Sequence, residues 1–416
     1  MTMELKALTL KQNFSWNFLG SLTYSLSQWL ILIVIARLGS PEVVGLYVLG
    51  MAITAPIIML TNLQLRSIQA TDTSSDYIFN DYIALRIFTG FIAIILTLAI
   101  SIINDYEPYK VAVISLIAFS KVIDSYSDVI YGQLQQKERM DYIGISRIIK
   151  GSLTIITVGV TMLITKNFLV SLIILNITWF VILITYDRRK IKLFVNNIIP
   201  KFQVKKIKKL IILAFPLGVI LMLGSLNTNI PRIIVEKYLG EEKLGYFAAI
   251  TYIMVAGSAF VNAIGQASAP RLAKLYKNAK LKSFIGLLLK LLSIGIVLGI
   301  GGTLVSLFLG DFILKVVYGE PYTNYTNILI YAMIASIFDY SASFLGYGLT
   351  SMRLFKIQPL LGTIWLSVCI IFSLMLIPNF GLKGASFTLI VTSFTQFLLM
   401  LLIIIILIKK KEMKRM

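Results

Sequence analysis

The sequence predicts an all-α integral membrane protein, and three observations carry that prediction. The chain has 416 residues, of which 57% are hydrophobic, and its mean hydropathy is +0.85. Only 14% of the residues are charged, against about a quarter in a typical soluble domain. Apolar runs of about 20 residues, which is the length that crosses a bilayer as a helix, recur along the whole chain.

These apolar runs predict twelve transmembrane helices. The second, fourth and tenth are the most polar. The predicted spans are 13–36, 42–62, 82–103, 110–132, 144–164, 168–186, 210–230, 244–264, 284–309, 325–350, 357–377 and 384–408.

The positive charges follow a simple alternation. Of the 39 Lys and Arg residues, 28 lie at the two termini and in every second connection between spans. Positive charge marks the cytoplasmic side of a membrane protein, so we expect a multi-pass protein of the cytoplasmic membrane with both termini inside. The net charge of +20 then reflects orientation and attraction to anionic membrane lipids. No nucleic-acid partner is expected.

Composition also argues against an enzyme. The chain has no histidine and a single cysteine, Cys369, which removes His-based catalysis, His metal sites and an internal disulfide. It carries no phosphate-binding loop of the G-x-x-x-x-G-K-[ST] type. The outer connections, of at most about 15 residues, leave little room for the catalytic loop that we expect of a polysaccharide polymerase or ligase. We therefore expect no enzyme, no cofactor and no metal.

The spans fall into two six-helix halves. The N-terminal half is residues 1–186, a basic cytoplasmic linker is 187–209, and the C-terminal half with its basic tail is 210–416. The segment LGSPEVVGLY, which starts at Leu38, is echoed by LGEEKLGY, which starts at Leu239. Because six spans return the chain to the same side, this echo predicts a parallel pseudo-two-fold repeat of the halves around a central cavity.

Several segments resemble one family of transporters. ARLGSPEVVGLYVLG, LQLRSIQATD and DSYSDVIYGQLQQKERMD resemble the first half of bacterial polysaccharide-repeat flippases, and PLGVILMLGSLNTNIPRIIVEKYLG and GQASAPRLAKLY resemble their second half. This group belongs to the superfamily that includes multidrug extruders and the lipid II flippase. The resemblance implies translocation of an undecaprenyl-diphosphate-linked oligosaccharide to the outer leaflet for capsule, O-antigen or exopolysaccharide assembly. It also implies a polysaccharide polymerase and glycosyltransferases as partners.

The fourth span supplies the main candidates for substrate binding. Lys121, Asp124 and Asp128 are three and four residues apart and share one helix face. Ionisable groups inside a span are costly and usually face a cavity or a partner. These residues either line the central cavity, with Lys121 meeting phosphate, or form a Lys121–Asp124 pair against a neighbouring helix. We favour the cavity because Asp128 has no local partner.

Further candidates lie in both halves. Arg86 is either an interfacial side chain or a cavity cation, and the resemblance favours a functional role for Arg66. Arg147 and Lys150 are interpreted as anchors at the inner surface. In the second half, each candidate could bind substrate or have only a structural role; the group is Asn227, Asn229, Arg232, Lys290, Asp339 and Tyr340.

A rocking motion of the two halves would expose the cavity to each side in turn. The cations inside the spans, Arg86, Lys121 and Lys290, favour an anionic cargo. The alternative is a multidrug extruder of the same superfamily, for which acidic and aromatic cavity residues would be expected.

Overall fold

The computed structural model describes residues 7–72, 77–352, 354 and 357–413. Within these ranges the chain is helical and contains no strand. Its contacts divide it into two compact units, Met1–Ser225 (unit 1) and Leu226–Met416 (unit 2). Five basic residues used in the charge argument lie outside the described residues; they are Lys6, Arg353, Lys356, Lys414 and Arg415.

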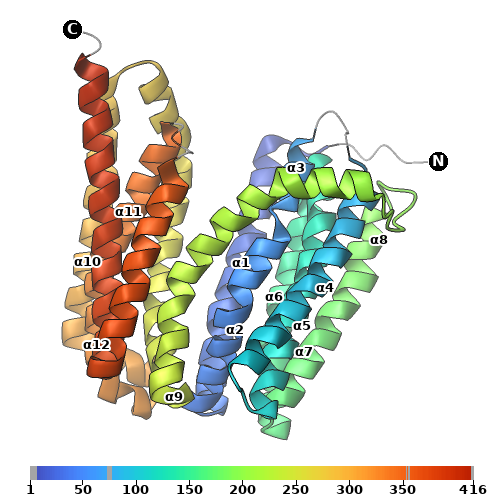
Figure 1. The fold of residues 1–416 in the computed structure, drawn as a ribbon, viewed down its shortest axis with the longest axis horizontal. Helices are drawn as coiled ribbons and strands as arrows, with labels where there is room; N and C mark the ends of the chain where they lie inside the picture. The colour runs from blue at the N-terminus through green and yellow to red at the C-terminus, as the bar shows by residue number, and fades with distance from the viewer. Residues whose placement is uncertain (1–6, 73–76, 353, 355–356, 414–416) are drawn as a thin grey trace. The chain divides into compact units, whose positions relative to one another are not determined.

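Unit 1 is a bundle of helices followed by the start of a longer one (Figure 1). Its elements are α1 (Leu10–Leu38), α2 (Pro41–Asn62), α3 (Leu65–Thr71), α4 (Phe79–Ile103), α5 (Pro108–Gln136), α6 (Met140–Thr165), α7 (Phe168–Ile182), the π-helical turn η1 (Leu183–Asp187), α8 (Arg188–Ile191) and the first part of α9 (Val204–Lys277).

Unit 2 contains the rest of α9, α10 (Leu281–Val317), the 3₁₀ turn η2 (Glu320–Tyr325), α11 (Thr326–Ser351) and α12 (Ile357–Met413). Two of these helices are each interrupted once. Gly240 in α9 has φ 84° and ψ 173°, and Gly381 in α12 has φ 58° and ψ −137°. Residues with a side chain rarely adopt such angles, so the two glycines mark sharp breaks. Both fall where the sequence predicts a connection between spans.

Nine helices of the described chain are long and apolar enough to cross a membrane. The interrupted α9 and α12 each count once among these nine, and α5, with its three central charges, is absent from them. Large apolar side chains such as Phe308, Ile103 and Ile164 are at least 77% exposed on the helices. Such exposure is typical of a multi-pass protein, in which lipid covers these surfaces.

Close backbone contacts hold α1 against α6 in unit 1. A Cβ atom added to Gly20 would lie 2.6 Å from Cα of Gly144, and one added to Gly144 would lie 2.5 Å from the carbonyl oxygen of Trp16. Small residues permit this kind of approach between membrane helices. The contact places α6, which carries Lys150, beside Tyr24 of α1.

The predicted linker is tied to the end of unit 1. The side-chain amide of Asn80, at the start of α4, donates to the carbonyl oxygens of Asn197 and Ile199 at 3.0 and 2.6 Å. The start of α9 crosses the same end of the bundle (Figure 1), where Lys206 lies 3.7 Å from Asp81. By its contacts, unit 1 extends through the linker and the first part of α9 as far as Ser225.

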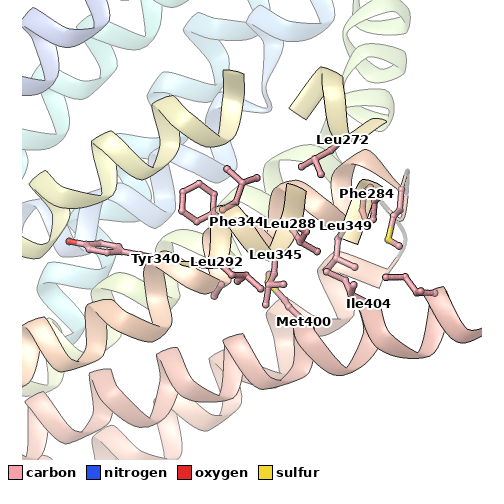
Figure 2. Packing of buried hydrophobic residues seen from close by; sticks show 14 of the residues in the cluster. Leu272, Phe284, Leu288, Leu292, Tyr340, Phe344, Leu345, Leu349, Met400 and Ile404 are labelled. Carbon is pink, nitrogen blue, oxygen red and sulfur yellow. The ribbon is translucent and has the colours of Figure 1, made fainter. Parts of the chain in front are cut away.

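The core of unit 2 forms where α10, α11 and α12 pack together. Figure 2 shows Phe344 and Leu345 of α11 beside Leu288 of α10 and Met400 of α12. The α10–α11 contact is close, since a Cβ atom on Gly299 would lie 2.6 Å from Cα of Ile337. This core is apolar, so unit 2 offers few charged groups between its helices.

Candidate functional site: a charged cluster in unit 1

An ion-pair network occupies the interior of unit 1. The side chain of Lys150, on α6, is fully buried, and its Nζ lies 3.2 Å from Oδ1 of Asp124 on α5 and 3.5 Å from Oδ2 of Asp187 at the end of η1. A buried ammonium group is costly unless it is paired. The two carboxylates provide that pairing, and they join three elements of the unit.

Hydroxyl groups complete the hydrogen bonding of the network. Asp187 accepts hydrogen bonds from Ser127 Oγ at 2.7 Å and from Ser146 Oγ at 2.6 Å. The hydroxyl of Tyr131 lies 2.6 Å from the same Ser146 Oγ, and Tyr24 of α1 donates to Oδ2 of Asp124 at 3.2 Å. Asp187 is thereby fixed, whereas Asp124 remains about one-third exposed.

A second ion pair lies along α5. Arg66 of α3 lies 3.3 Å from Asp128 and donates from Nε to Oε1 of Gln135 at 2.9 Å. The guanidinium carbons of Arg66 and Arg147 lie 5.7 and 5.9 Å from the centre of the Tyr131 ring, and Nζ of Lys150 lies 5.3 Å from it. Three cations therefore surround one aromatic ring.

Lys121 has a different environment from Arg66 and Lys150, which are paired with carboxylates. It lines a narrow cavity together with Gln28, Thr154 and Trp179. The volume of this cavity is ≈ 10 Å³, which is room for about one water molecule. The Nζ of Lys121 lies 5.9 Å from the Trp179 ring centre, and no ion pair of the described residues includes it. Lys121 and Arg147 are thus the two cations of this cluster without a carboxylate partner among the described residues, and Arg147 donates instead to Oγ of Ser21 at 2.6 Å.

These contacts correct two parts of the sequence interpretation. Asp128, which has no local partner on its own helix, is paired with Arg66 of α3. The closest cation to Asp124 is Lys150 and not Lys121. The face shared by Lys121, Asp124 and Asp128 is polar as predicted, but its charges are balanced by residues from α3 and α6 that lie far away in sequence.

Arg86 is a helix cap in this structure. Its side chain is buried, and its Nη1 donates to Oδ1 of Asn62 at 2.6 Å while Nη2 donates to the carbonyl oxygen of Asn62 at 3.1 Å. Asn62 is the last residue of α2, where unpaired carbonyls and the helix dipole favour a cation. The geometry assigns Arg86 to the α2 terminus.

The candidates of the second half do not form one cluster. Arg232 is 8% exposed, lies over the Tyr252 ring at 5.1 Å and donates to Oδ1 of Asn229 at 3.3 Å. Asn227 lies one turn before this pair, and its carbonyl oxygen is 3.4 Å from the sulfur of Cys369. These contacts link α9 to neighbouring side chains and leave little open surface.

The other three second-half candidates lie on α10 and α11. Lys290 is exposed on α10, and Asp339 of α11 lies near Ser258 of α9. The hydroxyl of Tyr340 donates to the carbonyl oxygen of Met254 at 2.8 Å, and the ring is 4% exposed. Tyr340 therefore packs between helices, which favours the structural role over substrate binding.

Sequence reasoning missed Lys150 and Asp187. Lys150 was interpreted as an anchor at the inner surface, and Asp187 was counted with the linker. A signal did exist, because Lys150 is the eleventh residue of α6 and lies three turns inside the helix. Neither residue, however, has its partner within one helix turn, so only the packed structure identifies the network.

Comparison with known proteins identifies the family of this chain. A family model described as polysaccharide biosynthesis protein matches residues 10–276. The chain belongs to this family. It is 34% identical over 394 residues to the capsular polysaccharide biosynthesis protein CapF of Staphylococcus aureus. The aligned region covers 93% of this chain and 97% of CapF.

Solved structures support the fold at low sequence identity. The lipid II flippase MurJ in an inward closed conformation is 14% identical, with a TM-score of 0.74 over 94% of this chain and 87% of MurJ. An inward-facing multidrug resistance transporter of the MATE family is 12% identical, with a TM-score of 0.67 over 94% and 95% of the two chains. The protein is thus a multi-pass helical membrane protein with the fold of flippases and transporters.

Proposed function

We propose that the protein is a flippase for undecaprenyl-diphosphate-linked oligosaccharide repeat units. It would move them from the inner to the outer leaflet of the cytoplasmic membrane for assembly of a capsule, O-antigen or exopolysaccharide. Membership of the polysaccharide biosynthesis family and the likeness to a lipid flippase support this class of cargo. A polymerase and glycosyltransferases would act beside it.

Twelve spans in two halves remain our proposal for the topology. Two of the nine candidate helices are each divided by a glycine, Gly240 or Gly381, and α5 is long enough to cross although its charges exclude it from the nine. Each divided helix would cross twice. Both termini would then lie in the cytoplasm, as the charge alternation predicts.

The observation that carries the proposed cargo is the excess of cations in unit 1. Around Tyr131 and Trp179 lie Arg66, Arg147, Lys150 and Lys121, while the carboxylates of the cluster belong to Asp124, Asp128 and Asp187. Two of the carboxylates are held by Lys150 and the third by Arg66. Lys121 and Arg147, which have no carboxylate partner among the described residues, would offer their charge to a diphosphate.

The same pairing weighs against the multidrug extruder. A site for cationic drugs needs a carboxylate that is free to meet the drug, whereas the three carboxylates of this cluster already have cationic partners. The likeness to MATE transporters concerns the fold and leaves the cargo to be decided by the site. Ethidium efflux by cells that express the protein, with normal polysaccharide export in cells that lack it, would establish the extruder instead.

The deciding experiment compares Lys121→Gln with Lys137→Gln in cells whose own copy is deleted. Lys137 is an exposed cation at the end of the same helix, so both changes remove one charge from α5. We expect Lys121→Gln to lower surface polysaccharide at least ten-fold at equal membrane abundance, and Lys137→Gln to leave it unchanged. Equal export by both variants would remove Lys121 from the cargo site.

A further inference from the structure

A second hollow lies at one end of unit 2. Its volume is ≈ 350 Å³, within the range of about 300–1,000 Å³ that is usual for ligand pockets. It forms where three interruptions of helix meet: the break at Gly240, the turn η2 and the break at Gly381. The residues used below are Lys243, Lys383, Asn324, Asn327, Tyr325 and Phe380, all of which line it.

The pocket lies at the opposite end of α10 from the basic connection 271–282. The pocket wall follows the last residues of α10 through η2, whereas the basic connection precedes its first residue, Leu281. A helix of 37 residues separates the two ends. If the basic connection is cytoplasmic, as the proposed function requires, the pocket opens on the outer side.

Two cations converge on this pocket from different helices. Lys243 comes from α9 and Lys383 from α12, and the lining contains no carboxylate. Lys243 donates to the hydroxyl of Tyr325 at 2.6 Å, and an ammonium group has two further N–H donors. Two like charges at one hollow repel each other, so an anion that binds between them is stabilised by both.

The pocket also has a rigid aromatic wall and two amides. The ring of Tyr325 lies 4.4 Å from that of Tyr246, which lies 5.0 Å from that of Tyr322. This stack fixes Tyr325, and the exposed ring of Phe380 lies on the wall contributed by α12. Asn324 and Asn327 are exposed and offer both donors and acceptors. Aromatic faces with amides suit the apolar faces and hydroxyls of a sugar ring.

We propose that this pocket binds an acidic sugar residue, such as a uronate, on the outer side of unit 2. The lysines would hold the carboxylate, the amides would meet the hydroxyls, and Tyr325 or Phe380 would stack on the ring. Its role in receiving the sugar of a translocated repeat rests on the proposed function. Binding itself depends only on the pocket.

Binding can be measured with two soluble tetrasaccharides on the purified full chain in phosphatidylcholine nanodiscs. The acidic probe is hyaluronan tetrasaccharide, which alternates glucuronate with N-acetylglucosamine, and the neutral probe is chitotetraose. We expect the acidic probe to bind at least ten-fold more tightly. Equal affinity for the two probes, or no binding of either, would overturn the proposal.

Variants locate the site. Lys243→Gln and Lys383→Gln should each weaken the acidic probe about ten-fold and leave the neutral probe unchanged, while Asn327→Leu should weaken both. The matched control is Lys237→Gln, which removes an exposed cation of α9 outside the lining. Thermal midpoints identify misfolded variants, and Asn324→Ala provides a second amide test. Wild-type affinity in both lysine variants would overturn the assignment.

Two further measurements test whether another anion occupies the pocket in place of an acidic sugar. Inorganic phosphate that displaces the acidic probe at equal concentration would indicate a general anion site and overturn the sugar assignment. Loss of probe binding in phosphatidylglycerol nanodiscs that persists when salt screens the membrane charge, and that excess probe restores, would indicate a competing lipid headgroup and overturn it too. The Lys121→Gln export comparison tests the proposed function by itself. Sugar binding to the pocket can persist even if export does not depend on Lys121, so the two proposals can fail independently.

Discussion

Lys150 and Asp187 form an ion pair in the interior of unit 1, with Nζ 3.5 Å from Oδ2 and at most 1% of either side chain exposed. The two residues belong to α6 and to the π-helical turn η1, so the pair joins the middle of one helix to the end of the next. Because Asp124 of α5 also contacts Lys150, a single ammonium group holds three elements together.

Removal of this ammonium group should destabilise the protein. In Lys150→Met two carboxylates lose their cation, one of them completely buried, and breaking a buried pair in this way costs about 3–5 kcal/mol. We expect a clear fall in the thermal midpoint of the detergent-solubilised protein and low membrane abundance.

The double variant Lys150→Met with Asp187→Asn is the control, because it removes both charges of the buried pair. It should recover most of the lost stability, since an amide at position 187 can accept from one of Ser127 and Ser146 and donate to the other hydroxyl. A double variant that is as unstable as the sum of its single variants would show that the two side chains act independently.

Arg86 should prove structural. Arg86→Met leaves the C-terminal carbonyls of α2 without their cation, which we expect to cost about 2–3 kcal/mol because buried acceptors lose charged partners. Asn62→Ala, which removes the 2.6 Å contact to Nη1 and keeps the guanidinium, should cost about 1 kcal/mol. Transport per folded molecule should stay near wild type; a stable Arg86→Met protein without export would instead place Arg86 in the cargo site.

The sequence predicted the helical membrane fold because hydropathy and charge act locally along the chain. The breaks at Gly240 and Gly381 fall between predicted spans for the same reason, since a short polar turn and a glycine are visible in the sequence. The site was predicted less well. Spacing placed Lys121, Asp124 and Asp128 on one face, but the partners Lys150 and Arg66 come from other helices.

The direction in which Tyr340 points could not be predicted from the sequence either. Tyr340 was a candidate for substrate binding and lies in a Tyr- and Ser-rich segment that is polar by composition, yet its hydroxyl donates to a carbonyl of α9 and its ring is buried. Helix packing decides which way a side chain points, and a single sequence contains no record of the neighbouring helix. Residue type predicted that the span was polar and could not predict the direction of each group.

The α1–α6 contact should be sensitive to a single methyl group. Gly144→Ala places a Cβ atom 2.5 Å from the Trp16 carbonyl oxygen, and backbone shifts of this kind cost about 1–3 kcal/mol. Gly159→Ala, on the same helix, meets only Cγ1 of Val34 at 3.8 Å and should be neutral or slightly stabilising. Thermal midpoints of the two variants test this, and similar values for both would show that the helices separate easily.

The double crossing of α9 can be tested by cysteine labelling. The only cysteine, Cys369, is buried, so Cys369→Ser provides a background for single cysteines at exposed positions. If α9 crosses twice, Arg189→Cys before it and Lys277→Cys at its end lie on the same, cytoplasmic side. Lys166→Cys, after α6, and Lys315→Cys, near the end of α10, lie outside.

A membrane-impermeant maleimide should label Lys166→Cys and Lys315→Cys in intact cells. It should label Arg189→Cys and Lys277→Cys only after permeabilisation. If α9 crosses once, Arg189→Cys and Lys277→Cys would label from opposite sides, and the proposal of twelve spans with both termini inside would be wrong.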